Sequence, residues 1–334
     1  MKAAIYYGVR DIRVEEIPKP VCGDYDVLVR SVRTGICGSD TGSWSLGGHV
    51  GGNRPGREIG HEMVGYVAEM GAKVTGIQLG DRVFVHPLKV MPMGESDMMG
   101  GFSEYVRVPN AKYNDNLYKL PDSLPYDEAV LIEPFAVATR GKNRPGAKVG
   151  DKVIVYGAGT IGLCCVASLV AQGITPIAVV RSNKRRAFLE KLGAIVCNTS
   201  EVDLFEFVKE HFGTATARVG YPIPNLDIMV DCAGGPQIPE EFVKMAKSGS
   251  RLSIVAIAKE PRMIPARLMS TEGFIHGSCC YDHEDLVEVI NNLANHTTCI
   301  PEIVTHHFPL EDINKAMELA NARDEAIKVV IDME

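Results

Sequence analysis

Three absences in this 334-residue sequence exclude whole classes of protein. No apolar run approaches the roughly 20 residues of a membrane-spanning helix, so we expect no membrane partner. The opening segment MKAAIYYGVRDIRVEEIPKP alternates like a strand and lacks the apolar stretch of a signal peptide, which predicts a cytoplasmic protein. Basic residues are fewer than acidic ones, 35 against 42, and the net charge of -7 argues against a nucleic-acid partner, because phosphates require a basic surface.

The cysteines lack the spacing of a disulfide framework or of a zinc knuckle. There are nine, an odd number, and no CxxC pair occurs. Cys164 with Cys165 and Cys279 with Cys280 are vicinal pairs inside apolar segments, where a bond between neighbours would strain the chain. We interpret most of the cysteines as small buried hydrophobic residues that a reducing compartment keeps as thiols.

The chain is long enough for two domains, and its character changes along its length. Up to about residue 140, segments such as DVLVRSVRTG and GDRVFVHP predict short strands joined by turns. From about residue 150, strands and helices alternate through DKVIVYGAGTIG, ITPIAVV, NLDIMVDCAGG and SRLSIVAIA, which predicts an α/β domain with a parallel sheet. Two amphipathic helical stretches, HEDLVEVINNLANH and LEDINKAMELANA, precede a last strand, AIKVVIDME.

A glycine-rich turn follows the first strand of the α/β region. An apolar strand at 153–156 precedes the turn and a helix at 163–172 follows it, which is the context in which GxGxxG binds a dinucleotide. The first glycine permits the tight turn, the second lets the backbone approach a pyrophosphate, and the third lets helix and strand pack closely. A purely structural glycine turn is the alternative. The predicted cofactor-binding turn contains Gly157, Gly159, Thr160, Ile161 and Gly162.

The end of the next strand discriminates between the two nicotinamide dinucleotides. A site for NAD usually places Asp or Glu there to hold the ribose hydroxyls. This sequence has Val180, Arg181 and Ser182, so no acid repels a 2′-phosphate, and Arg185 would add positive charge. A solvated basic turn at the head of a helix is the alternative. The pattern predicts NADP(H) as the cofactor in preference to NAD(H), bound by Arg181, Ser182 and Arg185.

Three residues near the N-terminus offer ligands for a metal ion. Cys37 lies in GICGSD, and His61 and Glu62 lie in REIGHEMVG. A thiolate, an imidazole and a carboxylate form a tetrahedral zinc set with one position open, and their wide spacing fits a catalytic site better than a structural one. Each residue alone has an ordinary structural explanation, but upstream of a dinucleotide-binding region the three together indicate a metal-assisted redox reaction.

Seven motifs occur in order over almost the whole chain: GICGSD, GREIGHEMVG, GDRV, GGFSEYVRVP, IEPFAVA, VYGAGTIG and VTHHFPLEDINKAMEL. Together they resemble the zinc-dependent medium-chain dehydrogenases/reductases of the alcohol dehydrogenase superfamily, nearest to the sorbitol and threonine dehydrogenase branch. The resemblance implies a GroES-like β-barrel catalytic domain from residues 1–139 and 282–334. It also implies a Rossmann domain, a six-stranded doubly wound parallel sheet, from residues 140–281. A homodimer or homotetramer is expected.

The resemblance also implies the roles of individual residues. Cys37 and His61 correspond to zinc ligands, and Glu62 to a further ligand in polyol dehydrogenases. Glu133, in IEPFAVA, would bind either the metal or its water, so the choice between Glu62 and Glu133 as the direct third protein ligand stays open. Ser39 corresponds to the first acceptor of the substrate proton. Zinc would polarise the substrate oxygen while a hydride passes between substrate and nicotinamide.

Two residues or segments need separate interpretation. Asp40 either orients His61 or caps a turn. Many relatives carry a lobe with four closely spaced cysteines that hold a structural zinc, whereas the segment LKVMPMGESDMMG after GDRV has none, so we predict one catalytic zinc and no structural zinc. The methionines of this segment would cover an active-site mouth or a subunit contact, or belong to a flexible loop.

The implied activity is that of a zinc-dependent alcohol dehydrogenase or carbonyl reductase. Its small-molecule substrate would be a polyol or a sugar-derived secondary alcohol or ketone, by analogy with the family. A zinc-free quinone or enoyl reductase and a non-catalytic nucleotide-binding protein of the same fold are the alternatives. The intact Cys37, His61 and Glu62 argue against the zinc-free reductase.

Overall fold

The computed structural model describes residues 1–90, 99–258, 261–322 and 325–334. The chain forms two compact units, Met1–Glu133 with Pro301–Glu334 and Pro134–Ile300. Most of the methionine-rich segment falls in 91–98, outside the described residues, and Met99 after it is buried. No helix in the described ranges is both long enough and apolar enough to cross a membrane.

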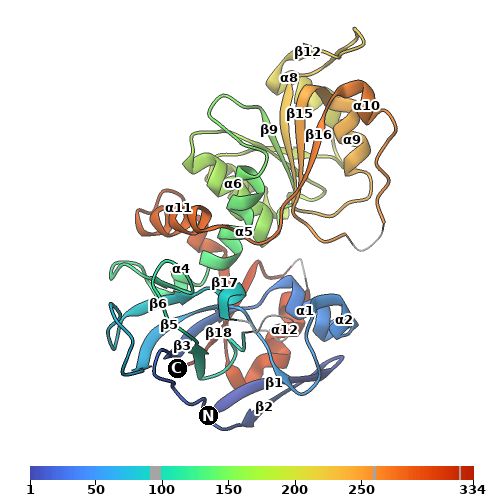
Figure 1. Ribbon diagram of the computed structural model, residues 1–334. Coiled ribbons are helices and arrows are strands. Elements are labelled where there is room, and N and C mark those ends of the chain that lie inside the picture. The colour runs from blue at the N-terminus through green and yellow to red at the C-terminus, as the bar shows by residue number, and fades with distance from the viewer. Residues whose placement is uncertain (91–98, 259–260, 323–324) are drawn as a thin grey trace. The chain divides into compact units, whose positions relative to one another are not determined.

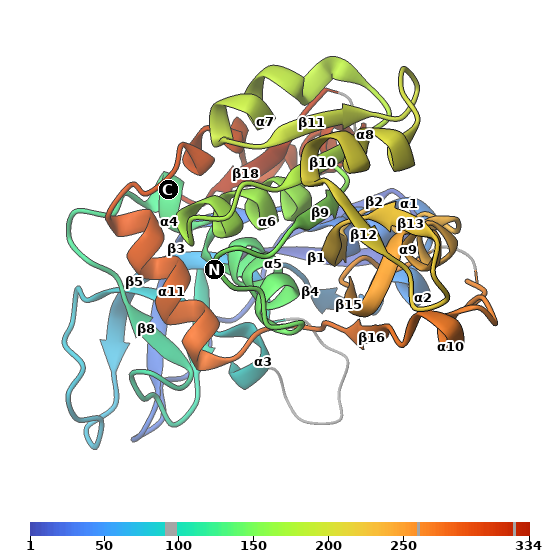
Figure 2. The same ribbon diagram turned by 90° about the horizontal axis from the view of Figure 1, so that it is seen from above.

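The first unit contains a seven-stranded and a three-stranded sheet, built from both ends of the chain. The larger sheet has the order β17-β18-β3-β5-β6-β8, with β7 paired to β3, and the smaller has the order β2-β1-β4. Strand β18, from the red end of the chain, lies antiparallel to β3 from the blue end (Figure 1 and Figure 2). The strands are β1 (Lys2–Gly8), β2 (Asp11–Glu16), β3 (Val27–Gly35), β4 (Arg57–Glu58), β5 (Glu62–Met70), β6 (Arg82–Val85), β7 (Tyr105–Val108), β8 (Leu117–Lys119), β17 (Val304–Pro309) and β18 (Lys328–Asp332).

Short helices complete the first unit. They are α1 (Gly38–Leu46), α2 (Gly48–Gly51), α3 (Pro87–Val90), α4 (Tyr126–Ala129) and α12 (Ile313–Asn321). The amphipathic pattern of LEDINKAMELANA is explained by α12, which buries Ile313, Ala316 and Met317 against a core that also contains Trp44 of α1. The two ends of the chain therefore share one hydrophobic core.

The second unit is a six-stranded parallel sheet with helices on both faces. Its order, β11-β10-β9-β14-β15-β16, is the doubly wound order of dinucleotide-binding domains, so the predicted Rossmann architecture is confirmed. The strands are β9 (Val153–Tyr156), β10 (Ile177–Val180), β11 (Ile195–Asn198), β14 (Leu226–Asp231), β15 (Ala246–Ile254) and β16 (Phe274–Gly277). A small ribbon is formed by β12 (Thr214–Thr216) and β13 (Pro222–Pro224).

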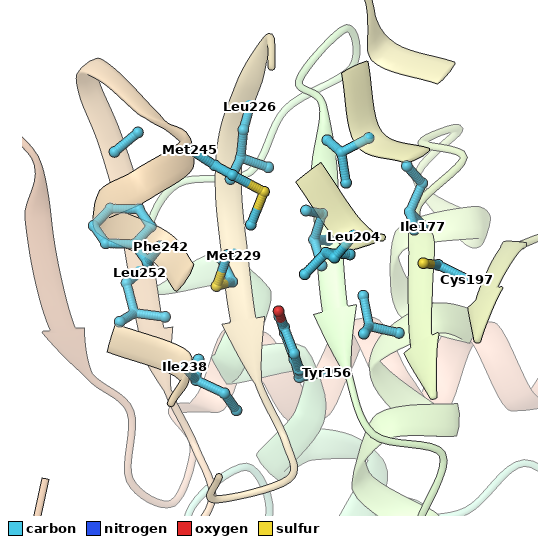
Figure 3. Close-up of a cluster of buried hydrophobic side chains, with 14 of the residues drawn as sticks. Tyr156, Ile177, Cys197, Leu204, Leu226, Met229, Ile238, Phe242, Met245 and Leu252 are labelled. Carbon is cyan, nitrogen blue, oxygen red and sulfur yellow. The ribbon is translucent and has the colours of Figure 1, made fainter. Parts of the chain in front are cut away.

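The helices of this unit are α5 (Ile132–Asn143), whose first two residues belong to the first unit, α6 (Thr160–Ala171), α7 (Arg186–Leu192), α8 (Leu204–Phe212), α9 (Ile238–Met245), α10 (Leu268–Thr271) and α11 (His283–Ala294). One face of the sheet packs against α8 and α9, as Figure 3 shows for Leu204 and Phe242 beside Tyr156 and Met229. Figure 1 shows α6 on the other side of the sheet from α9. Because both faces are covered, the strands are nearly continuous apolar runs, as in VIVY and IAVV.

Candidate functional site

The pairing of β3 with β5 brings the predicted metal ligands together. Gly35, the last residue of β3, lies opposite Glu62, the first residue of β5. Cys37 follows two residues later in an extended conformation as the N-cap of α1, and its backbone N–H donates to Asp40 Oδ2 at 3.0 Å. An acidic side chain in the first turn of a helix accepts hydrogen bonds from N–H groups that have no partner within the helix. Asp40 therefore stabilises the start of α1 next to Cys37.

One ligand atom each of Cys37, His61 and Glu62 all lie within 4.8 Å of one another. The His61 side chain is 12% exposed and Glu62 is buried. A thiolate, an imidazole and a carboxylate are ligands that zinc accepts, and three protein ligands leave a fourth position for a small molecule. The spacing and the chemistry of the donors therefore fit a single zinc ion.

Unpaired polar atoms at the same place also fit a bound metal. His61 Nδ1 and Asp40 Oδ1 are buried, make no hydrogen bond and lie 3.9 Å apart. Metal-binding histidines commonly donate their second ring N–H to a carboxylate. One oxygen of Asp40 accepts from the Cys37 N–H at the start of α1, and the other lies 3.9 Å from His61 Nδ1.

The electrostatics of the site favour an added cation. Burial lowers the pKa of His61, but Cys37 and Asp40 raise it by more, so its pKa lies well above the ordinary value. Burial and the neighbouring Glu62 carboxylate raise the pKa of Glu133 to about 7, although His61 opposes this rise. The raised pKa values of the histidine and of the carboxyl group show that this buried site favours added positive charge. A divalent cation would therefore be stabilised there.

Lys328 is a charged residue of the site that the sequence interpretation missed. It is buried at the start of β18, its Nζ donates to Ile36 O at 2.9 Å, and it forms a close ion pair with Glu62 Oε2. Burial lowers the pKa of Lys328, but Glu62 and Cys37 raise it by more. A Cβ on Gly35 would collide with Glu62 and Lys328, so the glycine makes room for this pair. In the sequence, a single lysine within the apolar strand AIKVVIDME was the feature that could have indicated a buried charge.

The other two predicted residues of this site occupy different positions. Ser39 is partly buried in α1, two residues after Cys37. Glu133 is buried near the start of α5 and acts electrostatically on His61 and Lys328, but it is not part of the mutually close group of Cys37, His61 and Glu62.

The glycine turn of the second unit lies between β9 and α6. Gly157 has φ +97°, and a Cβ there would approach Ala233 Cβ to 3.2 Å. A Cβ on Gly162 would collide with the carbonyl oxygen of Gly157, whereas a Cβ on Gly159 would meet no atom within 4 Å. Gly159 caps α6, which begins with Thr160 and Ile161. The open space at the start of this helix is where an anion is stabilised by backbone N–H groups.

The basic residues lie beside this turn, after β10. Arg181 and Ser182 are exposed, and the Ser182 hydroxyl accepts from the backbone N–H of Lys184 at 3.3 Å. The Arg185 guanidinium donates to the carbonyl oxygen of Ala158, inside the glycine turn. The strand before the turn is at Val153–Tyr156 as predicted, and the helix after it begins three residues earlier than predicted.

Family models match both units. The alcohol dehydrogenase GroES-like domain matches residues 23–122, and the zinc-binding dehydrogenase domain matches residues 160–295. The chain is 31% identical over 339 residues to (R,R)-butanediol dehydrogenase of Bacillus subtilis, covering 94% of each chain. It is 29% identical over 357 residues to sorbitol dehydrogenase of the same organism, covering 99% of this chain and 97% of the relative.

The fold agrees with these relatives. The crystal structure of 2R,3R-butanediol dehydrogenase from Bacillus subtilis superposes with a TM-score of 0.85 and 27% identity over 99% of both chains. The GroES-like and Rossmann architecture is therefore confirmed for both parts of the chain. On these matches, the chain belongs to the zinc-dependent medium-chain dehydrogenases, in the branch that includes sorbitol dehydrogenase.

Proposed function

We propose that this protein is a zinc-dependent dehydrogenase that transfers a hydride between NADP(H) and a polyol or a sugar-derived secondary alcohol or ketone. The observation that carries the proposal is the group of Cys37, His61 and Glu62, whose ligand atoms lie within 4.8 Å of one another. The similarity to sorbitol and butanediol dehydrogenases supports a substrate that carries more than one hydroxyl group.

Each side chain has a distinct task in the proposed reaction. Cys37, His61 and Glu62 hold the metal, and Asp40 orients His61. A bound zinc ion would supply a Lewis acid that polarises the substrate oxygen. Ser39, two residues from the Cys37 ligand, accepts the hydroxyl proton when an alcohol is oxidised and returns it when a carbonyl is reduced. Glu133 is the alternative third ligand, or the residue that holds a water at the metal.

Metal content tests the proposal. About one zinc per chain is expected by elemental analysis of protein purified without chelators, in line with one catalytic and no structural ion. Cys37→Ser should lose zinc and turnover but retain nucleotide binding, whereas Cys22→Ser, in the same unit, should retain all three. A wild-type protein without zinc, or an active Cys37→Ser variant, would contradict the ligand assignment and favour a zinc-free reductase or a nucleotide-binding protein.

Matched glycine substitutions test the dinucleotide turn. Gly159→Ala places its methyl group in open space at the start of α6, so the fold should be unchanged while nucleotide affinity falls. Gly162→Ala collides with Gly157, so both stability and nucleotide affinity should fall. Equal nucleotide affinity in Gly159→Ala and the wild type would show that the turn is structural only.

The preference for NADP(H) is supported by the basic residues after β10. Arg181 and Ser182 replace the expected acid, and Arg185 is held at the glycine turn by Ala158. A charge-assisted hydrogen bond contributes about 1.5–3 kcal/mol, so Arg181→Ala should lower kcat/KM for NADPH about 10- to 100-fold and leave NADH turnover unchanged. Arg218→Ala, an exposed arginine elsewhere in this unit, is the control. A wild-type preference for NADH would overturn the proposal.

A screen of sugar alcohols, vicinal diols and the matching ketoses, with each nicotinamide, would identify the substrate. Polyols should be oxidised in preference to simple apolar alcohols. Activity confined to simple alcohols would contradict the polyol assignment without affecting the zinc or nucleotide proposals.

A homo-oligomer, dimeric or tetrameric, is supported by the edge strand β16. This strand ends the six-stranded sheet, and its Phe274 is 57% exposed. Met263 and Met269, which are nearby in the sequence, are 86% and 83% exposed. Exposed apolar groups beside an unpaired strand edge favour association with another chain. A monomer by light scattering at micromolar concentration would contradict this proposal. The cytoplasmic location stays a prediction.

A further inference from the structure

Two neighbouring thiols follow the edge strand of the second unit and take no part in the reaction described above. Cys279 is exposed and Cys280 is partly exposed, and their Sγ atoms lie 3.3 Å apart. They lie in the short connection between β16 and α11, both orange in Figure 1. Cys280 has φ +55°, a left-handed conformation that is uncommon outside glycine and here accompanies the close approach of the two sulfurs.

Both ends of this connection are held in place. Ser278 N–H donates to Ile254 O at 2.9 Å, which continues the pairing of β16 with β15. At the other end, Asp282 N–H donates to Asp285 Oδ2 at 2.9 Å in a capping box that begins α11. The two thiols therefore lie in a segment that backbone hydrogen bonds anchor at both ends.

The accessible pair differs from the other cysteines of this unit. Only Cys164, Cys165 and Cys197 of the nine cysteines are buried, so the expectation that most of them are buried is wrong. Burial raises the pKa of Cys197 to about 11. A buried thiol with a raised pKa stays protonated and unreactive. Cys279, by contrast, is exposed to solvent. Cys232 and Cys299 are also partly exposed, but the thiol beside Cys232 is that of the buried Cys165. Cys279 and Cys280 are neighbouring thiols that both reach solvent.

The geometry favours a bridging atom over a direct disulfide. Consecutive Cα atoms are about 3.8 Å apart, less than the roughly 4.4–6.8 Å that disulfides usually span, so an S–S bond here would be strained and easily reduced. The two sulfurs lie 3.3 Å apart. If one atom bonded both of them at a typical thiolate distance of about 2.3 Å, the angle between its two bonds to sulfur would be about 92°. This angle suits a pyramidal trivalent centre and requires little movement of either side chain.

The position of the pair relates it to the dinucleotide, and this step rests on the proposed function. Arg181 follows β10 and Gly157 follows β9, so the ribose phosphate and the pyrophosphate would occupy the carboxyl ends of these two strands. The nicotinamide half must then extend away from β10, over β14, β15 and β16. Cys279 and Cys280 follow the carboxyl end of β16 and thus lie on the nicotinamide side of the sheet.

We propose that Cys279 and Cys280 form a dithiol site that takes a soft thiophilic centre of the trivalent arsenic class, and that its occupation hinders dinucleotide binding. In the reaction with an arsonous acid, two As–O bonds break and two As–S bonds form. The two thiol protons leave with the hydroxyl groups as two water molecules. No electron is transferred, so no oxidant is required.

Phenylarsine oxide is the probe that tests the site. The zinc-loaded protein should take up one phenylarsenic group, detected by intact mass, that resists excess 2-mercaptoethanol and is removed by 2,3-dimercaptopropanol. Cys279→Ser and Cys280→Ser should each weaken binding about 100-fold, because the second bond to a chelating pair is intramolecular. Cys22→Ser should bind like the wild type. Retained binding in Cys279→Ser, or a label mapped to other cysteines, would overturn the proposal.

A second measurement separates the site from its effect on the dinucleotide. Saturating NADPH should slow labelling of Cys279 and Cys280 at least severalfold, and the labelled protein should bind NADPH more weakly. Labelling of the pair with unchanged NADPH affinity would overturn the predicted hindrance. An unlabelled protein that still turns over NADPH would overturn the dithiol site while leaving the proposed function intact.

Discussion

The buried ion pair of Lys328 with Glu62 gives the sharpest prediction about the metal site. Both side chains are 2% exposed, and Lys328 Nζ also donates to Ile36 O at 2.9 Å. Removing one member of a buried pair costs about 3–5 kcal/mol, because the other charge is left without compensation. Lys328→Met should therefore destabilise the zinc-free first unit by about this amount.

Zinc should reverse part of the loss in Lys328→Met. In the wild type the ammonium group competes with the metal for Glu62 and repels a second cation, whereas in the variant zinc replaces the missing positive charge. We expect Lys328→Met to bind zinc about 10- to 100-fold more tightly, which corresponds to about 1.4–2.8 kcal/mol. By linkage, the gap in stability between zinc-loaded and zinc-free protein widens by the same amount.

Competition with a chromophoric chelator measures the zinc affinity, and urea unfolding with and without zinc measures the stability. Lys142→Met is the matched control, since Lys142 is equally buried and pairs with Glu288 at 2.9 Å in the other unit. It should destabilise its own unit without changing zinc affinity. Weaker zinc binding in Lys328→Met, as expected for Glu62→Gln, would refute the reasoning and show that Lys328 holds Glu62 in the ligand position.

Three further predictions concern stability and pH. Burial raises the pKa of Asp81, but hydrogen bonds from Lys119 at 2.5 Å, Tyr113 at 2.6 Å and a backbone N–H lower it by more, so the pKa is below its ordinary value. A carboxylate with a lowered pKa stabilises the fold fully above its unfolded-state pKa of about 4 and progressively less as the pH falls through the folded-state pKa. Asp81→Asn should thus lower the free energy of unfolding by about 1–3 kcal/mol at neutral pH. Urea unfolding at a series of pH values should show a smaller loss of stability at acidic pH in the variant than in the wild type. An equal loss at acidic pH in both proteins would contradict this. Lys119→Met should lower the stability less than Asp81→Asn, because the lysine is 54% exposed and the other donors to Asp81 remain. Equal losses in the two variants would show that the ion pair alone accounts for the contribution of Asp81. Phe242→Ala removes a fully buried ring from the core in Figure 3 and should destabilise the second unit by about 3–5 kcal/mol without changing zinc content, whereas a loss of zinc would link the two units.

Features that depend on local pattern were predictable from the sequence. The strand at Val153–Tyr156, the glycine turn and the amphipathic helix α11 follow from apolar periodicity and from backbone conformations that glycine permits. The motifs around Cys37 and His61 likewise predicted the ligands that the structure brings within 4.8 Å. The roles of Ser39 and Glu133, and the domain boundaries at 139/140 and 281/282, stay predictions.

Features that depend on pairing between distant segments required the tertiary structure. Lys328 reaches the carbonyl of Ile36, 292 positions away, only because β18 pairs with β3. Cys279 belongs to an apolar segment of the sequence, yet it is exposed in the connection between β16 and α11. The sequence alone determined which elements form and which residue types can bind zinc and a dinucleotide, because periodicity and donor chemistry are local properties. The tertiary structure decided which charges and thiols share a site, because burial and strand pairing depend on the whole chain.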